Sequence, residues 1–335
     1  MNDGGRFEEA RGILERRQFL KLVCGAGNED PVEVGRLATV YTLAGAAGLD
    51  LSANPLVVRS AREGIRRAED LAPRMGRTIR HVPFITVSVG LEGDPHIRKA
   101  HILEDRCTRC QVCRDACEQD AITEDCTVIT IRCIGCGKCG EVCEAGAIAF
   151  KDTPRDIAQV LPECLREGAE MVELHAVSVN EKQVMADWQV ISELVPGNYL
   201  SMCMDRSLLS NQQITDRIQR LYQITGQRLI IQADGAPMSG GEDDYHTTLQ
   251  AIATADIVAK SGVPVKILAS GGTNSRTRSL ADLCGVAIHG VSLGTFARKV
   301  VRRWISREDF EDNLPAVGEA VTVAEDLVRK NTGPG

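Results

Sequence analysis

Short runs of β-branched and apolar residues alternate with longer segments whose apolar positions follow helical spacing. The runs predict strands over residues 19–24, 49–52, 82–89, 171–175, 199–204, 228–232, 263–269 and 286–288. The longer segments predict helices from 30–31, over 54–71, 153–167, 181–194, 212–224, 244–260 and 275–283, and from Gly294. This regular alternation is typical of parallel strands joined by helical crossovers.

About eight strand–helix units favour a closed α/β fold, a (β/α)8 TIM-like barrel, over the alternative of an open doubly wound sheet. The alternation is interrupted once, after the third strand. We therefore expect a polar N-terminal segment (1–18), a first part of the barrel (19–93), an insertion (94–150), the remainder of the barrel (151–310), and a C-terminal helix and tail (311–335). In a barrel, an insertion after a strand lies at the face where active sites are built.

The insertion contains two runs of four cysteines with the same C-x-x-C-x-x-C-x-x-x-C spacing. The first is Cys107, Cys110, Cys113 and Cys117, and the second is Cys133, Cys136, Cys139 and Cys143. This spacing predicts a ferredoxin-like domain with two [4Fe–4S] clusters, in which the fourth cysteine of each run binds the other cluster. We expect Cys143 to join the first three cysteines of the first run, and Cys117 to join those of the second.

Structural zinc and disulfides are the alternatives. Zinc ribbons use two C-x-x-C pairs rather than runs of three plus one, and disulfides need an oxidising compartment that nothing in the sequence indicates. Glu118 and Glu144 stand where a proline commonly follows the fourth cysteine. Because that proline is not a ligand, the predicted ligand set is unchanged.

Glycines near the last two predicted strands indicate an anion site. Glycine lets backbone amides approach a phosphate closely, and a helix N-terminus adds its positive end. The expected residues of a flavin or phosphate-bearing ligand site are Asp234, Gly271, Gly272, Gly290 and Gly294. The alternative is that these glycines only form tight turns. No residues show a recognisable catalytic spacing, so we assign no catalytic residue and expect no defined catalytic activity.

Charge and composition limit the classes of partner and the cellular location expected for the 335-residue chain. Its formal net charge of −7 argues against nucleic-acid binding and against a polybasic membrane patch. No apolar run approaches the roughly 20 residues of a membrane span, and the first 17 residues lack the apolar core of a signal peptide. We therefore expect a cytoplasmic protein. The five cysteines outside the runs are expected to be reduced thiols, mostly buried: Cys24, Cys126, Cys164, Cys203 and Cys284.

Several stretches resemble the cyanobacterial light-dependent period (LdpA) family. They are Phe19 to Ala26, Tyr41 to Gly45, Gly93 to Ala100, Asp234 to Gly240 and Gly271 to Asn274, in the family's order. The resemblance implies an iron–sulfur protein that passes cellular redox state to the circadian clock, with redox carriers or clock-associated proteins as partners.

The expected function is therefore redox sensing or electron transfer. The main alternative is a ferredoxin-linked oxidoreductase that acts on a phosphorylated substrate, or uses flavin, at the barrel mouth. A third is a scaffold whose clusters only hold the insertion together.

Overall fold

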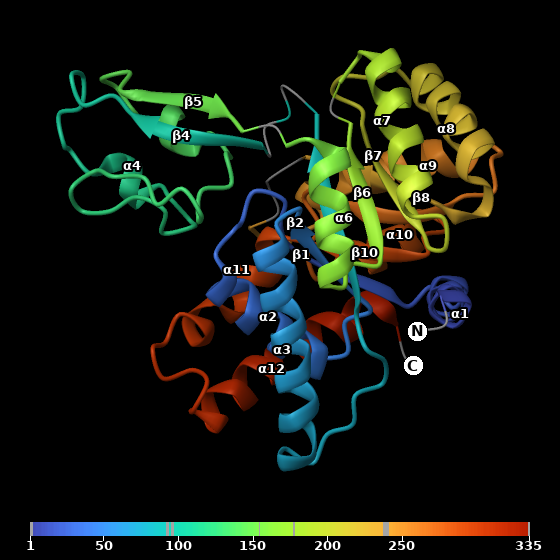
Figure 1. Cartoon of the computed structure of the whole chain (residues 1–335), viewed down its shortest axis with the longest axis horizontal. Coiled ribbons are helices and arrows are strands. Elements are labelled where there is room, and N and C mark those ends of the chain that lie inside the picture. Colours follow the sequence, from blue (N-terminus) through green and yellow to red (C-terminus); the bar gives the residue numbers. More distant parts are fainter. Residues whose placement is uncertain are drawn as a thin grey trace.

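Eight parallel strands close into a barrel in the order β1-β10-β9-β8-β7-β6-β3-β2 (Figure 1). The computed structural model describes residues 3–91, 94, 97–153, 155–176, 178–236 and 241–333. The barrel strands are β1 (Phe19–Gly25), β2 (Gly48–Ser52), β3 (Phe84–Gly90), β6 (Met171–His175), β7 (Leu200–Asp205), β8 (Leu229–Asp234), β9 (Lys266–Ser270) and β10 (Gly290–Leu293). The predicted α/β barrel is confirmed.

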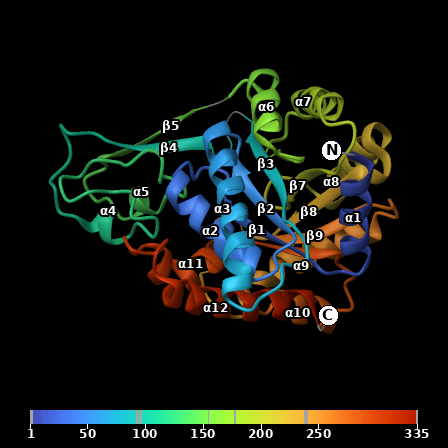
Figure 2. The ribbon, with the colours of Figure 1, turned by 60° about the horizontal axis from the view of Figure 1, so that its bottom comes forward.

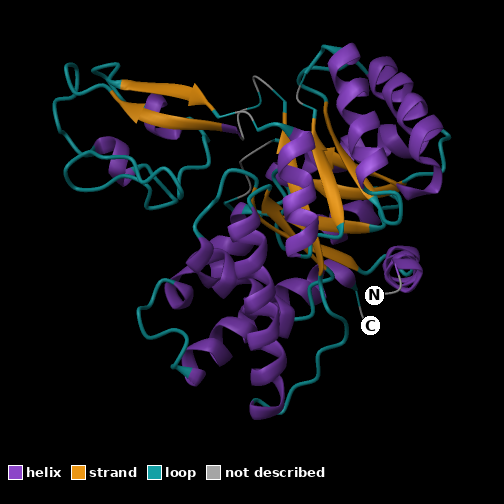
Figure 3. Ribbon diagram, viewed as in Figure 1, coloured by secondary structure: helices purple, strands orange, loops and turns teal. Residues whose placement is uncertain are grey.

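Helices surround the strands (Figure 3). They are α2 (Pro31–Leu43), α3 (Pro55–Arg74), α6 (Ile157–Glu167), α7 (Glu181–Leu194), α8 (Asn211–Thr225), α9 (His246–Lys260), α10 (Thr277–Leu283), α11 (Thr295–Ile305) and α12 (Leu314–Thr332), with a 3-10 turn η2 (Gly226–Arg228) before β8. Alternating side chains divide each strand between two environments. On β1, Leu20 and Leu22 join the main apolar core with residues of the helices, whereas Lys21 pairs with Asp50 and Glu173 of other strands.

The polar N-terminal segment, for which the sequence predicted no particular element, contains a helix, α1 (Asp3–Glu15). Its buried Ala10, Ile13 and Leu14 form a second apolar cluster with Phe19 and Phe84 at the starts of two barrel strands. The helix therefore covers the amino-terminal end of the barrel (Figure 2).

The last strand was predicted four residues too early, at 286–288, and that prediction is wrong. Gly285 adopts a left-handed φ of +67°, and the Val286 amide donates a 2.9 Å hydrogen bond to the Ala281 carbonyl, which ends α10. Val286 and Ile288 are buried as part of the connecting loop. A short apolar run buried in a loop has the same sequence pattern as a short strand.

The helix predicted from residue 153 begins later, at Ile157. Its N-cap is Asp156, whose side chain accepts from the Ala158 amide at 2.9 Å. Pro154, which suggested the earlier start, lies outside the described residues, as do residues 93, 95, 96 and 237–240 of the stretches that carried the family resemblance.

The insertion forms a separate lobe beside the barrel (Figures 1 and 2). Its β4 (Arg98–Ile102) and β5 (Ile148–Asp152) pair antiparallel, and two short helices, α4 (Val112–Asp115) and α5 (Lys138–Glu141), lie between them in the sequence. The lobe leaves the barrel after β3 and returns before α6. Within the described part of the chain, no helix combines the length and the apolar character that a membrane crossing requires.

Candidate functional site

A cavity in the lobe is bounded by four cysteine side chains, those of Cys117, Cys133, Cys136 and Cys139. These are the four that the crossed arrangement predicts for one cluster. Apolar side chains, among them Phe150, complete its wall. The structure therefore brings together a thiol set of the kind that holds a [4Fe–4S] cluster, in a cavity that Gln119 and Lys138 also line.

Burial and neighbouring thiols change the pKa values of two of these cysteines. Burial raises the pKa of Cys136, and burial together with the neighbouring thiols raises the pKa of Cys139 to about 12. Such thiols keep their protons at neutral pH unless iron replaces them. The Ala100 amide points at the Cys133 sulfur at 3.4 Å. Amide donors to sulfur are among the interactions that set a cluster's potential.

The first three cysteines of the first run differ in their exposure to solvent. Cys110 is exposed, Cys107 is half-buried and Cys113 is buried. Burial and the nearby thiols of Cys126 and Cys107 raise the pKa of Cys113. Cys126 is thus a ninth thiol beside the predicted first cluster, and the Gln111 side-chain amide donates to its sulfur at 3.5 Å. The sequence did not reveal this proximity because Cys126 belongs to neither run.

The fourth cysteines of the two runs have matching environments. The Ala121 amide donates to the Cys117 sulfur at 3.4 Å, and the Ala147 amide donates to the Cys143 sulfur at 3.3 Å. Each donor is the amide four residues further along the chain. This local repeat agrees with equivalent roles for the two cysteines in the two halves of the lobe.

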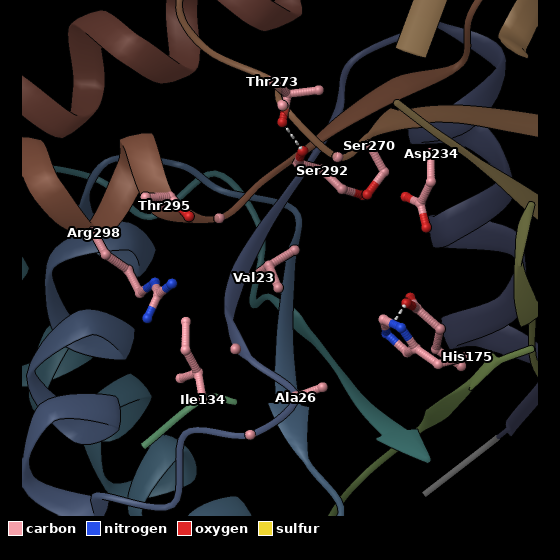
Figure 4. Close-up of a pocket in the computed structure, with 16 residues that line it drawn as sticks. Val23, Ala26, Ile134, His175, Asp234, Ser270, Thr273, Ser292, Thr295 and Arg298 are labelled. Carbon is pink, nitrogen blue, oxygen red and sulfur yellow. Dashed lines mark hydrogen bonds and ion pairs between the residues drawn. The ribbon is translucent and has the colours of Figure 1, made fainter. Parts of the chain in front are cut away.

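The barrel has a pocket at the carboxyl ends of its strands (Figure 4). Four of the five predicted ligand residues line it: Asp234, Gly271, Gly272 and Gly294. Gly271 and Gly272 both have left-handed φ angles, of +63° and +80°. These conformations favour glycine. The loop after β9 therefore presents only backbone atoms at these two positions.

Gly290, the fifth predicted residue, is not part of the pocket, so its predicted location is wrong. It is the first residue of β10, in register with Phe19, at the barrel end that α1 covers. A Cβ there would lie 2.0 Å from the Phe19 carbonyl oxygen. Close strand packing, rather than access for an anion, requires this glycine.

Arg298 is a pocket residue that the sequence reasoning missed. It lies in the first turns of α11, is 4% exposed, and donates from Nη1 to the Gln119 side-chain oxygen at 2.7 Å. Its Nε has no hydrogen-bond partner among the described residues. A buried guanidinium with a spare donor is suited to an anionic group. The sequence did contain a signal for this residue: it is an arginine four residues after Gly294, at the start of a helix that follows a barrel strand.

Glu173 and His175 form the floor of the pocket and belong to a buried network with Lys21 and Asp50, which do not line it. Lys21 Nζ lies 2.6 Å from Asp50 Oδ2 and also pairs with Glu173, while His175 Nε2 lies 2.8 Å from Glu173 Oε1. Burial alone would lower the pKa of His175, but the carboxylates of Glu173, Asp94 and Asp234 outweigh it and raise that pKa to about 10. The sequence signal for Lys21 and Glu173 was their charge in the middle of otherwise apolar strands.

Two polar residues near the ends of barrel strands make local hydrogen bonds and do not line this pocket. Asn54 caps α3, accepting from the Leu56 amide at 3.0 Å, and Asp205 accepts from the Ser207 amide at 2.7 Å. The barrel pocket therefore takes its polar groups mainly from β6, β8 and the loops after β9 and β10.

The barrel pocket and the cysteine cavity share a wall. Ile134, between Cys133 and Cys136, lines both, and Figure 4 shows it beside Arg298, across the pocket from Asp234 and His175. The buried Lys99 joins the two parts, since its Nζ donates to the Gly27 carbonyl at 2.5 Å and to the Cys133 carbonyl at 2.7 Å. A group bound by the cysteines would therefore adjoin a ligand in the barrel.

Comparison with known proteins gives two family matches. Residues 100–123 match the "4Fe-4S binding domain" family, and residues 164–330 match the "Light dependent period A C-terminal domain" family. The first match identifies the chain as an iron–sulfur protein with a [4Fe–4S] binding motif. It covers all four cysteines of the first run, from Cys107 to Cys117.

One curated relative is similar over nearly the whole chain. "Light dependent period A" of Synechococcus elongatus is 32% identical over 330 residues, which cover 94% of this chain and 91% of the relative.

Similar solved structures include the YdjI aldolase of Escherichia coli K12, with 6% identity, a TM-score of 0.48 and coverage of 96% of this chain and 93% of that one. A putative deoxyribose-phosphate aldolase of Toxoplasma gondii ME49 has 11% identity, a TM-score of 0.44 and coverage of 96% and 98%. Similarities at this level carry no argument about ligand or reaction.

Proposed function

This chain belongs to the Light dependent period A family, and on that premise we propose that it is a redox-sensing, electron-transferring protein with two [4Fe–4S] clusters. One cluster uses Cys117, Cys133, Cys136 and Cys139, and the other uses Cys107, Cys110, Cys113 and Cys143. The observation that carries the proposal is the lobe cavity, where four thiols from both runs meet next to the barrel pocket.

The clusters act by carrying single electrons. A cube held by four thiolates has no open iron position for a substrate, and its potential depends on charge, sulfur hydrogen bonds and exposure. The sequence of the lobe is already acidic, with nine acidic and five basic residues between Glu104 and Phe150. Reduction adds a further negative charge to it.

That charge change reaches the barrel through the contacts between the lobe and α11. Arg302 Nη1 lies 3.0 Å from Asp120 Oδ2, and Arg298 donates to Gln119. Asp120 and Gln119 closely follow Cys117 in the chain. A coupling of ~1–2 kcal/mol between cluster charge and partner docking would change partner affinity roughly five- to thirtyfold.

The signal goes to protein partners, redox carriers or components of a circadian clock, as the family implies. We place the protein in the cytoplasm, because all 13 of its cysteines are unpaired and a reducing compartment maintains both thiols and clusters. Neither nucleic acid nor membrane insertion is part of this function.

The proposal is tested by capturing partners under oxidised and dithionite-reduced conditions with anaerobically purified protein. At least one partner should bind with different affinity in the two states, and Cys136→Ser should remove that difference. Cys164→Ser is the matched control, because Cys164 is a buried thiol of α6 that packs in the main apolar core of the barrel. Partners whose binding ignores redox state, together with turnover of a small molecule, would contradict the sensor function.

A second candidate is an oxidoreductase that receives electrons from the clusters and uses flavin, or acts on a phosphorylated substrate, in the barrel pocket. The specific support is Arg298, which lines the same pocket as Gly271 and Gly272 and whose buried Nε has no hydrogen-bond partner among the described residues. A phosphate group placed there would meet bare amides, a helix N-terminus and a guanidinium.

Binding of inorganic phosphate and of flavin mononucleotide to the cluster-loaded protein tests this candidate. Arg298→Met should weaken binding at least tenfold, because it removes the buried charge. Arg303→Met should leave binding unchanged, because Arg303 is exposed on the same helix. Equal affinity in both variants, or no binding to the unaltered protein, would rule out the anion site.

A further inference from the structure

Three side chains with metal-binding atoms meet at the floor of the barrel pocket. Glu173, His175 and Cys203 each offer one such atom, and the three atoms lie within 4.8 Å of one another. The Cys203 sulfur is 3.1 Å from Glu173 Oε1 and 3.8 Å from His175 Nδ1. Across the described ranges of the chain, this is the one group of at least three such residues that meets that distance.

The barrel itself fixes this convergence. Glu173 and His175 are two residues apart on β6, so their side chains leave the same face of the strand. Cys203 is on the neighbouring β7, and the parallel register pairs Glu173 with Ser201 and Leu174 with Met202. Glu173 is 1% exposed, Cys203 2% and His175 8%. Donors on adjacent strands of a closed barrel need little ordering when an ion binds.

Outer partners orient the donors toward a common point. Lys21 Nζ and the Ser201 hydroxyl both engage Glu173 Oε2, the hydroxyl at 3.3 Å, so that Oε1 faces His175 and Cys203. The Gln232 side-chain amide points at the Cys203 sulfur at 3.7 Å. Metal ligands are commonly held in this way by hydrogen bonds from a surrounding layer of side chains.

The local charge also suits a cation. Four carboxyl groups, those of Asp50, Glu173, Asp94 and Asp234, are buried in or beside this floor, against the amine of Lys21 and the imidazole of His175. A metal ion that binds His175 replaces the proton that this ring otherwise holds. Asp94 Oδ2 lies 4.0 Å from His175 Nδ1. Buried carboxylates in excess of buried cations are stabilised by a further positive charge.

We propose that Glu173, His175 and Cys203 form a mononuclear site for a divalent transition metal ion, best suited to Zn²⁺, at the floor of the barrel pocket. One carboxylate, one imidazole and one thiolate are ligands that zinc accepts, and three protein ligands leave a fourth position open. Glu173 and His175 line the pocket, so the open position faces it. The site is separate from the cysteine runs and goes beyond the redox function proposed above.

The alternative is that the three side chains only hydrogen-bond to one another. Cobalt distinguishes the two cases, because Co²⁺ replaces Zn²⁺ in such sites and its X-ray absorption edge is separate from that of iron. Cluster-loaded protein, prepared anaerobically and freed of other divalent ions, is titrated with Co²⁺. We expect about one Co²⁺ per chain, with one sulfur and the remaining ligands nitrogen or oxygen, in competition with Zn²⁺.

Variants locate the ion. Cys203→Ser should remove the sulfur contribution and weaken Co²⁺ binding at least tenfold, and His175→Gln should weaken binding while keeping the sulfur. Cys164→Ser, a buried cysteine on a helix away from the pocket, should change neither.

Three results would overturn the site: no stoichiometric binding by the unaltered protein, two or more sulfurs around cobalt, or an unchanged spectrum in Cys203→Ser. Several sulfurs would place the ion in the cysteine runs instead. Because the unaltered protein alone can give the first two results, the test does not depend on the variants folding.

Discussion

At the scale of single residues, Gly290 is a glycine required by strand packing, in contrast to the glycines that line the barrel pocket. Gly290→Ala places a methyl group against the Phe19 backbone, 2.0 Å from its carbonyl oxygen, and a backbone neighbour cannot move aside cheaply. We expect a loss of about 1–3 kcal/mol of stability, the usual cost of overpacking. Thermal unfolding of the two proteins under identical anaerobic conditions measures it.

Gly5→Ala is the control for this change. Gly5 lies in α1 with nothing within 4 Å of the added Cβ, so alanine should be neutral or should stabilise by roughly 0.5–1 kcal/mol. Equal unfolding temperatures for Gly290→Ala and the unaltered protein would show that β1 and β10 do not pack as described.

His289 supplies a pH-dependent contribution to stability. Burial, followed by the positive charges of Lys266 and Arg17, lowers its pKa to about 4, and its Nδ1 accepts the Ile267 amide at 3.0 Å. The folded state therefore holds the neutral ring, while the unfolded chain binds a proton near pH 6.5. This contribution is fully present above about pH 6.5 and decreases as the pH falls toward 4, by up to roughly 3 kcal/mol.

His289→Asn tests that assignment. The asparagine side-chain oxygen can accept the same amide hydrogen bond but does not titrate. The variant should lose less stability than the unaltered protein between pH 7 and pH 4.5, as measured by chemical denaturation. Parallel pH profiles for the two proteins would contradict the role of His289.

At the scale of elements, α1 depends on one arginine. Arg6 donates from Nε and Nη2 to the two carboxylate oxygens of Glu170, at 2.7 and 2.9 Å, and its guanidinium lies 3.7 Å from the centre of the Phe84 ring. Arg6→Lys loses the paired geometry and the stacking. We expect a loss of about 1–2 kcal/mol. Arg11→Lys, on the same helix and more exposed, should have little effect.

Hydrogen–deuterium exchange of α1 checks this prediction, because a loosened helix exchanges faster along its whole length. Faster exchange in Arg6→Lys, with Arg11→Lys unchanged, is the expected result. Identical protection in all three proteins would mean that apolar burial of α1 is sufficient without Arg6.

The predictability of the elements depended on their local signals. The helix Glu181–Leu194 was predicted with its observed bounds, because Asn180 caps it and its apolar spacing is regular. In contrast, α1 has a weakly apolar sequence, and the barrel end it covers becomes apolar only when distant strands come together. The strand prediction for Val286 to Ile288 was wrong for the opposite reason, because this segment is apolar but is buried as a loop.

The sites show the same division. The spacing of the cysteine runs is enough to predict an iron–sulfur site. The glycines after β9 are enough to indicate a loop whose backbone amides an anion could approach. Lys21, Glu173, Cys203 and Arg298 carry no motif, because each comes from a different element and only the closed barrel brings them together. Cys126 likewise approaches the first run only through the turn of the lobe.

At the scale of the whole molecule, the lobe joins the barrel at the face formed by the carboxyl ends of its strands. The lobe is inserted where β3 ends, and its cysteine cavity lies against the barrel pocket through Ile134. Figure 2 shows the lobe alongside α2 and α11, while α1 lies at the far side of the barrel. Electrons held in the lobe would therefore act near the pocket and far from the end closed by α1.

The crossed use of the two cysteine runs is the central structural claim, and paramagnetic resonance of the reduced protein with iron analysis tests it most directly. The unaltered protein should carry about eight irons, as two four-iron clusters require. Cys117→Ser should lose the signal of the cluster held by Cys133, Cys136 and Cys139 and keep that of Cys107, Cys110 and Cys113. Zinc in place of iron, or selective loss of the first cluster in Cys117→Ser, would contradict the account.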